Sequence, residues 1–535
     1  MAFVNAMNSV KKGVNGADVY TETGVGNARV ALFSMLNRDL ETDYLYGAVK
    51  KIVERVDEPL DLFLMAFQTR DVRGGKGERL LFYQWIHVLY HYFPAITAGM
   101  LSLVPEYGCW RDLWSIWVKV PELGPVILQL VQKQFMEDLA KAGSGASGVS
   151  LLAKWLPREA SKTYPGMAGK IAAALYPREK NPRVRYRKET SFINSVLKTV
   201  EINMCGGTWR TIQPEAVPGR CLKLHDKAFL NEKGGDLRYP NCDDRMVCRE
   251  HFHAFLEGLA AGTKKAHGAN VVFPHELVLK AQDPSTTADQ QVINQAQWES
   301  ICAETRKLGG LGKAVAICDF SGSMSGIPLQ ISLALGILIS ECTHPSFRDY
   351  ILTFDATPQW HSFVGHTTLK AKLDSLRGCG QGLNTNFYKA CQMILARLIQ
   401  YRVPADEAPE DLIVITDMGF DDASNAVNQS SSSRQSPWET QLTRIRREFQ
   451  EAGEYLWGKA WKPPRIVVWN VRAAFHDFHA AADQEGVVQL SGWSPSILKA
   501  LQTGIQATTP YQGMRLVLDD ARYDPVRALW KTYAA

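Results

Sequence analysis

In this 535-residue chain the hydrophobic pattern changes its period near residue 308. From about Thr23 to Cys302, apolar residues recur at three- and four-residue spacing, as in a succession of amphipathic helices. Short Pro and Gly breaks, such as Phe93-Pro94, separate most of these segments. Many short helices with tight connections predict an all-α helical-repeat array of the HEAT-like kind, although the repeats have no fixed period.

After residue 308, short apolar runs alternate with helical patterns. The five runs are residues 314–319, 350–354, 411–416, 465–471 and 487–490. Continuous apolar runs of this length predict strands of a mostly parallel sheet that has helices on both faces. The C-terminal part is therefore expected to be a doubly wound, Rossmann-like α/β domain. We place the two domains at residues 1–305 and 306–535.

Composition and cysteine spacing limit the compartment and the partners. Sixty Lys and Arg against 55 Asp and Glu leave a formal charge of +5, which by itself does not argue for a nucleic-acid partner. The ten cysteines include no CxxC pair, so we expect them to be reduced. The N-terminus lacks an apolar leader, and no stretch reaches the roughly 18 apolar residues of a membrane helix. These features predict an intracellular protein, cytoplasmic or nuclear, without a membrane partner.

An acidic residue and two hydroxyls follow the first predicted strand. This strand ends in Asp319, and Ser321 and Ser323 follow at alternate positions before a helical pattern. In an open α/β sheet, ligands bind beyond the carboxyl ends of the strands, where this turn must lie. One carboxylate and two hydroxyls form a set of hard oxygen ligands that suits Mg²⁺. The alternative is an ordinary turn, because Asp and Ser also cap helices.

Two further elements place oxygen ligands at other strand ends. Thr385 lies in a loop ahead of a helix, and Asp417 directly follows the predicted strand 411–416. Together the three elements resemble the metal-ion-dependent adhesion site of von Willebrand factor A domains. This resemblance implies a von Willebrand A-like fold for residues 306–535, with Mg²⁺ or another divalent cation such as Mn²⁺ or Ca²⁺ as cofactor. It implies five metal-site residues: Asp319, Ser321, Ser323, Thr385 and Asp417.

Other motifs do not favour catalysis. Met324 stands where a nucleophile elbow would need serine, and the segment Arg73–Gly77 lacks the spacing of a P-loop. With no candidate nucleophile or acid–base pair, we expect the protein not to be an enzyme. Zinc binding remains open at four residues that lie close in sequence: Cys242, Cys248, His251 and His253. Their spacing matches no standard zinc motif, and the alternative is buried thiols beside two ordinary histidines.

Residues 151–190 carry a concentrated positive charge, with ten Lys and Arg against three Glu, a net charge of +7. Four aromatic residues are interleaved with them: Trp155, Tyr164, Tyr176 and Tyr186. Basic side chains that neutralise phosphates and aromatic rings that stack on unpaired bases are what single-strand binding requires. The alternative is a solvated basic face. The expected phosphate contacts are Lys154, Arg158, Lys162, Arg183, Arg185 and Arg187.

A second basic group precedes this stretch and could line one RNA-binding opening together with it: Arg70, Arg73, Lys76, Arg79 and Arg111. Acidic neighbours offer a different explanation for these residues. Asp71, Glu78 and Asp112 could pair with them as salt bridges at helix junctions.

Several phrases resemble an uncharacterised family of plant, microbial and large-virus proteins over nearly the whole chain. They are residues 70–79, 107–113, 154–159, 186–188 and 273–276, followed by CDFSGSMSG and LSGWSPSILK. The helical half of that family is similar to the TROVE module of the Ro autoantigen, an RNA-binding ring of helical repeats closed by a von Willebrand A domain. This resemblance implies that single-stranded RNA ends bind in the central hole and that structured RNAs bind on the outer face.

Two functions follow from these patterns. The first is a non-catalytic RNA-binding protein resembling Ro ribonucleoproteins, in which a helical ring binds single-stranded or structured RNA and a Mg²⁺-binding von Willebrand A domain closes the ring. The alternative is a metal-dependent protein–protein interaction scaffold without RNA binding, in which the cation keeps an open position for an acidic side chain of a partner protein. The basic stretch favours the first function, and the metal motif favours the second.

Overall fold

The fold is known from a computed structural model. It describes residues 10–12, 18–55, 59–265, 272–307, 311–354, 358–379, 387–418, 437–473, 478, 480–498, 501 and 507–534. The chain divides into two compact units that do not follow a single boundary after residue 305. The sheet unit comprises Met1–Asp61, Gly74–Lys76 and Gly268–Ala521, and the helical unit comprises Leu62–Arg73, Gly77–His267 and Arg522–Ala535.

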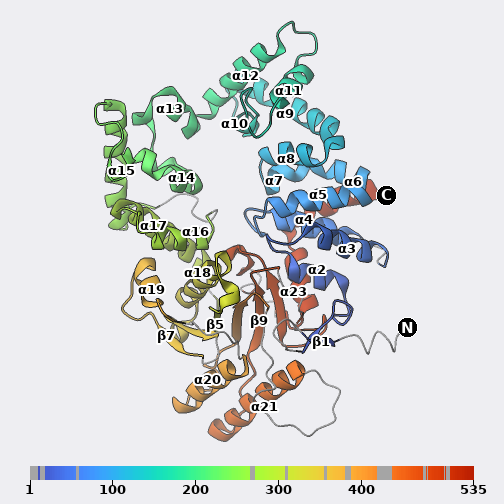
Figure 1. The fold of residues 1–535 in the computed structure, drawn as a ribbon, viewed down its shortest axis with the longest axis vertical. Coiled ribbons are helices and arrows are strands. Elements are labelled where there is room, and N and C mark those ends of the chain that lie inside the picture. Colours follow the sequence, from blue (N-terminus) through green and yellow to red (C-terminus); the bar gives the residue numbers. More distant parts are fainter. Residues whose placement is uncertain are drawn as a thin grey trace. The chain divides into compact units, whose positions relative to one another are not determined.

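The helical unit consists almost entirely of helices. Its α-helices are α4 (Leu60–Arg70), α5 (Leu80–Tyr92), α6 (Pro94–Met100), α7 (Val104–Tyr107), α8 (Arg111–Lys119), α9 (Gly124–Ser144), α10 (Leu152–Trp155), α11 (Met167–Leu175), α12 (Pro182–Leu197), α13 (Val200–Gly206), α14 (Gly219–Phe229), α15 (Asp243–Ala260) and α24 (Asp524–Ala534) (Figure 1). The described strands among residues 59–265 are those of one short antiparallel pair, β3 (Glu232–Lys233) and β4 (Asp236–Leu237). The helix-rich character that the periodicity predicts for this part is confirmed. None of the described helices has the combination of length and apolar composition that crossing a bilayer demands.

Local sequence explains how these helices begin, end and pack. Proline occupies one of the first two positions of α6, α7, α9 and α12, where a backbone N–H has no helical partner in any case. Gly145 ends α9 with a φ of +69°, a conformation that glycine adopts without a steric penalty. In α8, the side chains of Leu113, Trp114, Ile116 and Trp117 are buried. Helix stability here comes mainly from burying such a face.

The C-terminal segment belongs to the helical unit because it packs against α4 and α7. The ring of Trp530 in α24 lies 5.4 Å from that of Phe63, and Tyr523 stacks on Tyr107 with ring centroids 5.8 Å apart. Arg522 donates from Nη2 to Oδ1 of Asp71 at 2.7 Å, and Asp71 is fully buried. Residues 522–534 therefore complete the helical core rather than the sheet.

The sheet unit is built around a six-stranded mixed sheet. In spatial order its strands are β10 (Val487–Ser491), β9 (Arg465–Asn470), β8 (Asp411–Thr416), β5 (Ala314–Asp319), β6 (Tyr350–Phe354) and β7 (Trp360–Ser362). All neighbouring strands are parallel except β7, which pairs antiparallel with β6 at the edge. The five predicted strands are confirmed. The three-residue strand β7 was not predicted.

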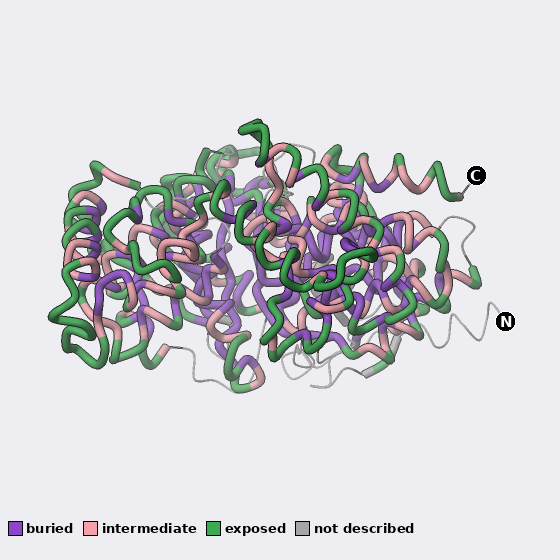
Figure 2. Tube along the Cα trace, turned by 90° about the horizontal axis from the view of Figure 1, so that it is seen from above, coloured by how far each residue is buried: buried purple, intermediate pink, exposed green. Residues whose placement is uncertain are grey.

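Both faces of the sheet are covered by helices. Side chains of β5 alternate between two cores, with Ala316 and Cys318 in one and Val315 and Ile317 in the other. The first core also contains residues of α16 (Pro274–Gln282), α17 (Ala288–Lys307), α18 (Ile327–Cys342) and α19 (Leu369–Ser375). The second contains residues of α20 (Phe387–Gln400) and α21 (Pro437–Trp457). Figure 2 shows buried segments inside and exposed segments around them.

Two segments expected in the helical array belong to the sheet unit instead. Helices α16 and α17 bury Leu277, Trp298 and Ile301 in the core on one face of the sheet. The second segment is N-terminal and contains β1 (Val10–Lys12), β2 (Asp18–Tyr20), α2 (Ala28–Met35) and α3 (Thr42–Val53). The same unit also contains α23 (Pro510–Leu518), near its C-terminal end. The hydroxyl of Ser491 donates to the carbonyl oxygen of Phe33 at 2.7 Å, which holds α2 at the carboxyl end of β10.

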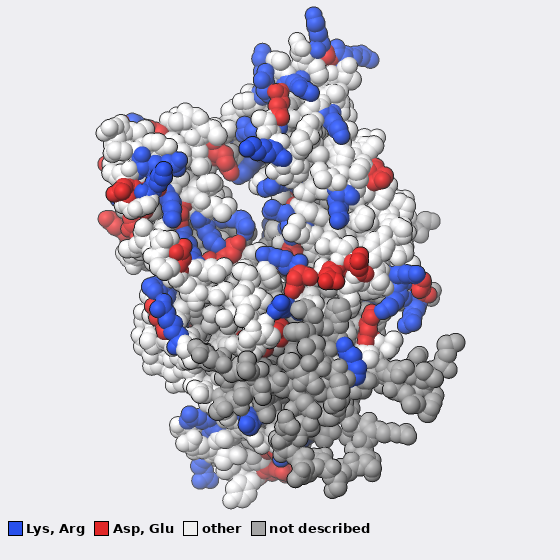
Figure 3. Space-filling view, in the orientation of Figure 1, with Lys and Arg blue, Asp and Glu red and all other residues white. Residues whose placement is uncertain are grey.

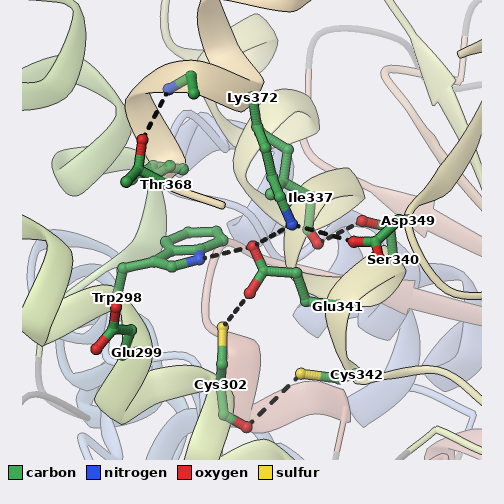
Figure 4. Close-up of polar contacts among 12 residues, drawn as sticks. Trp298, Glu299, Cys302, Ile337, Ser340, Glu341, Cys342, Asp349, Thr368 and Lys372 are labelled. Carbon is green, nitrogen blue, oxygen red and sulfur yellow. Dashed lines mark hydrogen bonds and ion pairs between the residues drawn. The ribbon is translucent and has the colours of Figure 1, made fainter. Parts of the chain in front are cut away.

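A buried charge network joins three helices on the first face of the sheet (Figure 4). Lys372 of α19, 6% exposed, donates to the carboxylate of Glu341 at 3.0 Å and to Asp349 at 3.2 Å. Glu341 of α18 also accepts hydrogen bonds from the indole N–H of Trp298 at 3.1 Å and the thiol of Cys302 at 3.2 Å, both on α17. The network fixes the positions of α17, α18 and α19 against one another.

Candidate functional site

The candidate metal site lies at the carboxyl ends of the two central strands, β5 and β8. These strands pair in parallel, with Cys318 opposite Ile415. The strand order reverses between them, because β6 and β7 continue on one side of β5 while β8, β9 and β10 continue on the other. Ligands of open α/β sheets bind at the carboxyl ends of strands where the order reverses. Asp319 ends β5 and Asp417 directly follows β8, so both acids lie at this position.

Asp319 organises the turn after β5. Its carboxylate is fully buried, and Oδ1 accepts a hydrogen bond from the Ser321 amide at 2.9 Å. The hydroxyls of Ser321 and Ser323 lie 3.0 Å apart. The second oxygen, Oδ2, accepts a hydrogen bond from the hydroxyl of Thr416 at 2.9 Å. Asp319, Ser321 and Ser323 are therefore brought together as the sequence pattern requires.

The electrostatics of the site come from two acids buried close together. Burial raises the pKa of Asp319 from its ordinary value of 3.8 to about 7, and the charge of Asp417 adds to the increase. Hydrogen bonds from Ser321 and Thr416 to the carboxylate act in the opposite direction without cancelling it. Asp417 is itself fully buried. A cation between the two acids would favour their ionised forms.

The oxygen donors present suit a hard divalent cation. Two carboxylates and two hydroxyls are ligands that Mg²⁺ accepts, with water filling its remaining positions. In the described part of the chain, no three His, Cys, Asp or Glu side chains converge in a metal-binding group. A cation at this position would therefore need hydroxyl and water ligands in addition to the two acids. Thr385, the fifth expected ligand, lies outside the described residues.

Two backbone positions beside the site have positive φ angles. Gly326, between the turn and α18, has a φ of +90°, which suits glycine because it has no side chain to clash. Met418 has a φ of +74°, and this left-handed conformation costs a residue with a side chain about 1–2 kcal/mol. The Met418 amide donates to the Thr416 hydroxyl at 3.2 Å. This hydrogen bond and the left-handed conformation of Met418 define the turn in which Asp417 lies.

Two residues near the site were not predicted from the sequence. Thr416 supplies the hydrogen bond to Asp319 described above, and its position next to Asp417 at a strand end was the available signal. Arg472, just after β9, donates from Nη1 to the carbonyl oxygen of Ser323 at 2.6 Å. No local pattern marks Arg472, because its contact depends on how β9 and β5 lie in the sheet.

The predicted basic stretch is a mostly exposed surface of the helical unit, where Lys and Arg gather over α11 and α12 at the upper end of Figure 3. Arg158, Lys162 and Arg183 are exposed, as expected for phosphate contacts. Arg185 is exposed but ion-paired with Glu179 at 2.7 Å and Glu189 at 2.8 Å. Two further expected contacts also have acidic neighbours: Arg187 lies 3.8 Å from Glu159, and half-buried Lys154 lies 2.8 Å from Glu201.

The aromatic part of that prediction is wrong for the three tyrosines. Tyr164, Tyr176 and Tyr186 are each less than a tenth exposed. Their hydroxyls hydrogen-bond within the unit, for example from Tyr186 to the carbonyl oxygen of Pro157 at 2.7 Å. Their rings pack in the helical core and cannot stack on a base. Trp155 is half-buried.

The second basic group is divided by the structure. Arg70 is 2% exposed and pairs with buried Asp112 at 2.7 Å, so the salt-bridge alternative is confirmed for it. Lys76 is 1% exposed and donates to the hydroxyl of Ser491 at 2.6 Å. Neither Arg70 nor Lys76 can contact a phosphate in this arrangement.

The other three members of that group keep some exposure. Arg79 is exposed, with Nε 3.6 Å from Oδ1 of buried Asp112. Arg73 is exposed and donates to the carbonyl oxygen of Glu106 at 2.7 Å. Arg111 is half-buried, with Nε 3.4 Å from the hydroxyl oxygen of Tyr164.

The four residues considered for zinc do not form a three-ligand group among the described residues. Cys248 lies buried on α15, and burial raises the pKa of its thiol to about 11, which disfavours the thiolate that zinc binds. Cys242 and His251 are exposed. The alternative of buried thiols therefore holds for Cys248 and is wrong for Cys242.

Comparison with known proteins finds family matches for two segments of the chain. Residues 127–311 match the family described as "Domain of unknown function (DUF2828)", and residues 313–517 match the one described as "Domain of unknown function (DUF7788)". The chain is also similar to an uncharacterized protein of Acanthamoeba polyphaga mimivirus, with 26% identity over 96% of this chain and 88% of that protein. The family match over residues 313–517 begins directly before β5 and includes both Asp319 and Asp417.

Proposed function

We propose that this protein is a non-catalytic RNA-binding protein that also binds a divalent cation. The observation that carries the RNA proposal is a group of exposed basic side chains that form no ion pair with the described acids. This group, called the basic surface, consists of Arg158, Lys162, Arg178, Lys180, Arg183 and Lys188. All six belong to α12 or to the loops around α11. Unpaired Lys and Arg on one surface neutralise phosphates, which supports binding to single-stranded or structured RNA.

The RNA proposal is tested by the salt dependence of binding. We expect wild type to bind a 3′-tailed RNA in fluorescence anisotropy, with affinity that falls as salt rises. Each phosphate contact adds about 0.7 to the slope of log K against log salt for a single strand. The variant Arg158→Glu/Lys162→Glu/Arg183→Glu should therefore reduce the slope by about 2.

A matched control separates a local contact from the change in total charge. Lys119, Lys133 and Lys531 are exposed in the same unit, outside the basic surface. Reversing these three lysines to glutamate changes the net charge by the same amount and should leave most of the slope in place. Absence of RNA binding by wild type even at low salt would refute the RNA proposal.

The sheet unit would hold the cation through Asp319, Asp417, Ser321 and Ser323. What supports this is that two buried carboxylates lie where the strand order reverses. A bound Mg²⁺ supplies positive charge for the two acids and an open position for an acidic oxygen of a ligand. The likeness of these motifs to the von Willebrand A adhesion site favours the same interpretation.

Titration calorimetry with Mg²⁺ tests the metal site. Asp319→Ala should abolish binding while the circular dichroism spectrum stays unchanged. Ser325→Ala is the matched control, because Ser325 lies in the same turn but is exposed and donates to the carbonyl oxygen of Gly322 at 2.6 Å. Equal Mg²⁺ affinity in wild type and Asp319→Ala would show that the site is assigned wrongly.

The second candidate function is a metal-dependent protein–protein interaction scaffold. It is favoured by the position of the two acids and does not require the basic surface. The two functions separate in the same experiments. Mg²⁺ binding without RNA binding would support the scaffold function. RNA binding with equal affinity in wild type and Asp319→Ala would indicate that RNA binding depends on the helical unit alone.

A further inference from the structure

Helix α12 has an exposed stripe with a four-residue period. Apart from Arg185, which is ion-paired with Glu179 and Glu189, its exposed side chains recur as adjacent pairs: Arg183 and Val184, Arg187 and Lys188, Ser191 and Phe192, Ser195 and Val196. Because residues four apart lie on the same face of a helix, these pairs form one continuous surface along the helix. Ile193 and Asn194, between two of the pairs, are buried and fix the opposite side.

The chemistry of this α12 stripe changes along its length. The N-terminal half carries the cations Arg183, Arg187 and Lys188. The C-terminal half carries no charge up to residue 197 and presents Phe192, which is 44% exposed, and Val196, which is 37% exposed. A chain of phosphates with attached bases complements this order, since it offers negative charge beside flat apolar surfaces.

Phe192 is the aromatic side chain that the basic surface otherwise lacks. The three tyrosines of residues 151–190 are packed in the core, as described above. Phe192 is the only exposed phenylalanine among the residues that the structure describes. It lies one helical turn after Lys188, and the hydroxyl of Ser195 is turned back onto its carbonyl oxygen at 2.7 Å.

We propose that the α12 stripe binds single-stranded nucleic acid, with Arg183, Arg187 and Lys188 at the phosphates and the Phe192 ring stacked on an unpaired base. The inference rests on the proposed RNA binding and adds the class of ligand and the residue that selects it. A duplex keeps its bases stacked on one another, so it can use the cations but not the ring. Phe192 therefore favours single strands over duplexes.

The test compares Phe192→Ala with wild type on a single-stranded RNA that contains 2-aminopurine and on a duplex RNA of equal charge. Stacking of one base on an aromatic side chain is worth a change of about 5- to 150-fold in affinity. We expect Phe192→Ala to weaken single-strand binding by at least fivefold and to leave duplex binding and the salt slope unchanged. Quenching of 2-aminopurine fluorescence on binding should be lost in Phe192→Ala and retained in Phe192→Trp.

Val184→Ala is the matched control, because Val184 is 40% exposed on the same stripe but has no ring. It should bind single strands like wild type. Unchanged single-strand affinity and quenching in Phe192→Ala would overturn the inference, while RNA binding lost on reversal of the basic surface would still uphold the proposed function. If wild type binds no nucleic acid, both fail. Parallel arms with single-stranded DNA and RNA show whether the sugar matters, and a Phe192→Ala defect confined to a protein partner would also overturn the inference.

Discussion

At the scale of single residues, the candidate metal site depends on the balance between burial and hydrogen bonding at Asp319. Burial and the nearby Asp417 charge favour the protonated acid, whereas Ser321 and Thr416 favour the carboxylate. A cation that binds here competes with a proton for the carboxylate of Asp319. The behaviour of the site should therefore depend on pH near neutrality, which is unusual for an aspartate.

Mg²⁺ affinity should rise between pH 6 and pH 8. With a pKa of about 7 for Asp319, the carboxylate fraction increases about tenfold over this interval. We expect the Kd for Mg²⁺, measured by calorimetry, to be about tenfold lower at pH 8 than at pH 6. The same Kd at both values would contradict the assigned environment of Asp319.

Without the cation, the contribution of Asp319 to stability changes with pH in the direction opposite to the Mg²⁺ affinity: it falls as pH rises. Because the pKa is raised in the folded state, the folded protein binds a proton that the unfolded chain has released between about pH 4 and 7. The contribution of Asp319 to the free energy of unfolding thus decreases as pH rises through that window. Asp319→Asn should remove this part of the pH dependence, as measured by urea unfolding in EDTA.

Thr416→Val should weaken Mg²⁺ binding at pH 7. The change keeps the shape of the side chain but removes the donor to Oδ2 of Asp319, so the pKa of the acid rises further. We expect a several-fold increase in the Kd for Mg²⁺. The control is Thr353→Val, since Thr353 is likewise buried, on strand β6 at the other side of β5, and its hydroxyl accepts from the Gln359 amide at 2.9 Å. An equal effect of both variants would indicate a general loss of stability instead.

At the scale of elements, the network around Glu341 shows how helices expected in the array are held to the sheet. Periodicity indicates that α17 buries one face, but it does not say what covers that face. Trp298 and Cys302 of α17 donate to Glu341, and Lys372 supplies the compensating cation. The network thus depends on three helices that are far apart in the sequence.

Lys372→Met should destabilise the sheet unit. The variant leaves the largely buried Glu341 without its main cation, and breaking a buried ion pair on one side costs about 3 kcal/mol. Lys370→Met is the control, because the Lys370 pair with Asp374 at 3.0 Å is exposed and worth about 0.5 kcal/mol at most. Chemical denaturation should show a large shift for the first variant and almost none for the second. Equal shifts would mean that the network adds no stability.

At the scale of the whole molecule, a segment near each end of the chain belongs to a different unit than its position in the sequence predicts. The N-terminal helix α2 is held by Ser491 at the carboxyl end of β10. The C-terminal helix α24 completes the core of the helical unit. Each unit therefore needs segments from distant parts of the chain.

Deleting residues 522–535 should destabilise the helical unit and leave the sheet unit folded. The deletion removes the partner of fully buried Asp71 and uncovers the rings of Phe63 and Tyr107. We expect hydrogen exchange to accelerate in α4 and α7 and to stay slow in β5 and β8. Arg522→Met should reproduce part of this effect, whereas Arg527→Met, whose half-buried side chain pairs with the exposed Asp524, should not. Uniform acceleration in both units would contradict the division of the chain.

The amino-acid sequence by itself determined the change from helices to sheet, the five longer strands and the cluster of Asp319, Ser321 and Ser323. Local periodicity carries this information, because apolar runs bounded by polar turns leave few alternatives. Only the tertiary structure decided which basic and aromatic residues are accessible. Arg70 and Tyr186 have the same local patterns as exposed residues, but their buried partners, Asp112 in α8 and Pro157 in the loop after α10, lie elsewhere in the chain. The edge strand β7 and the contact of Arg472 with Ser323 likewise depend on neighbours distant in the chain, and no local pattern records them.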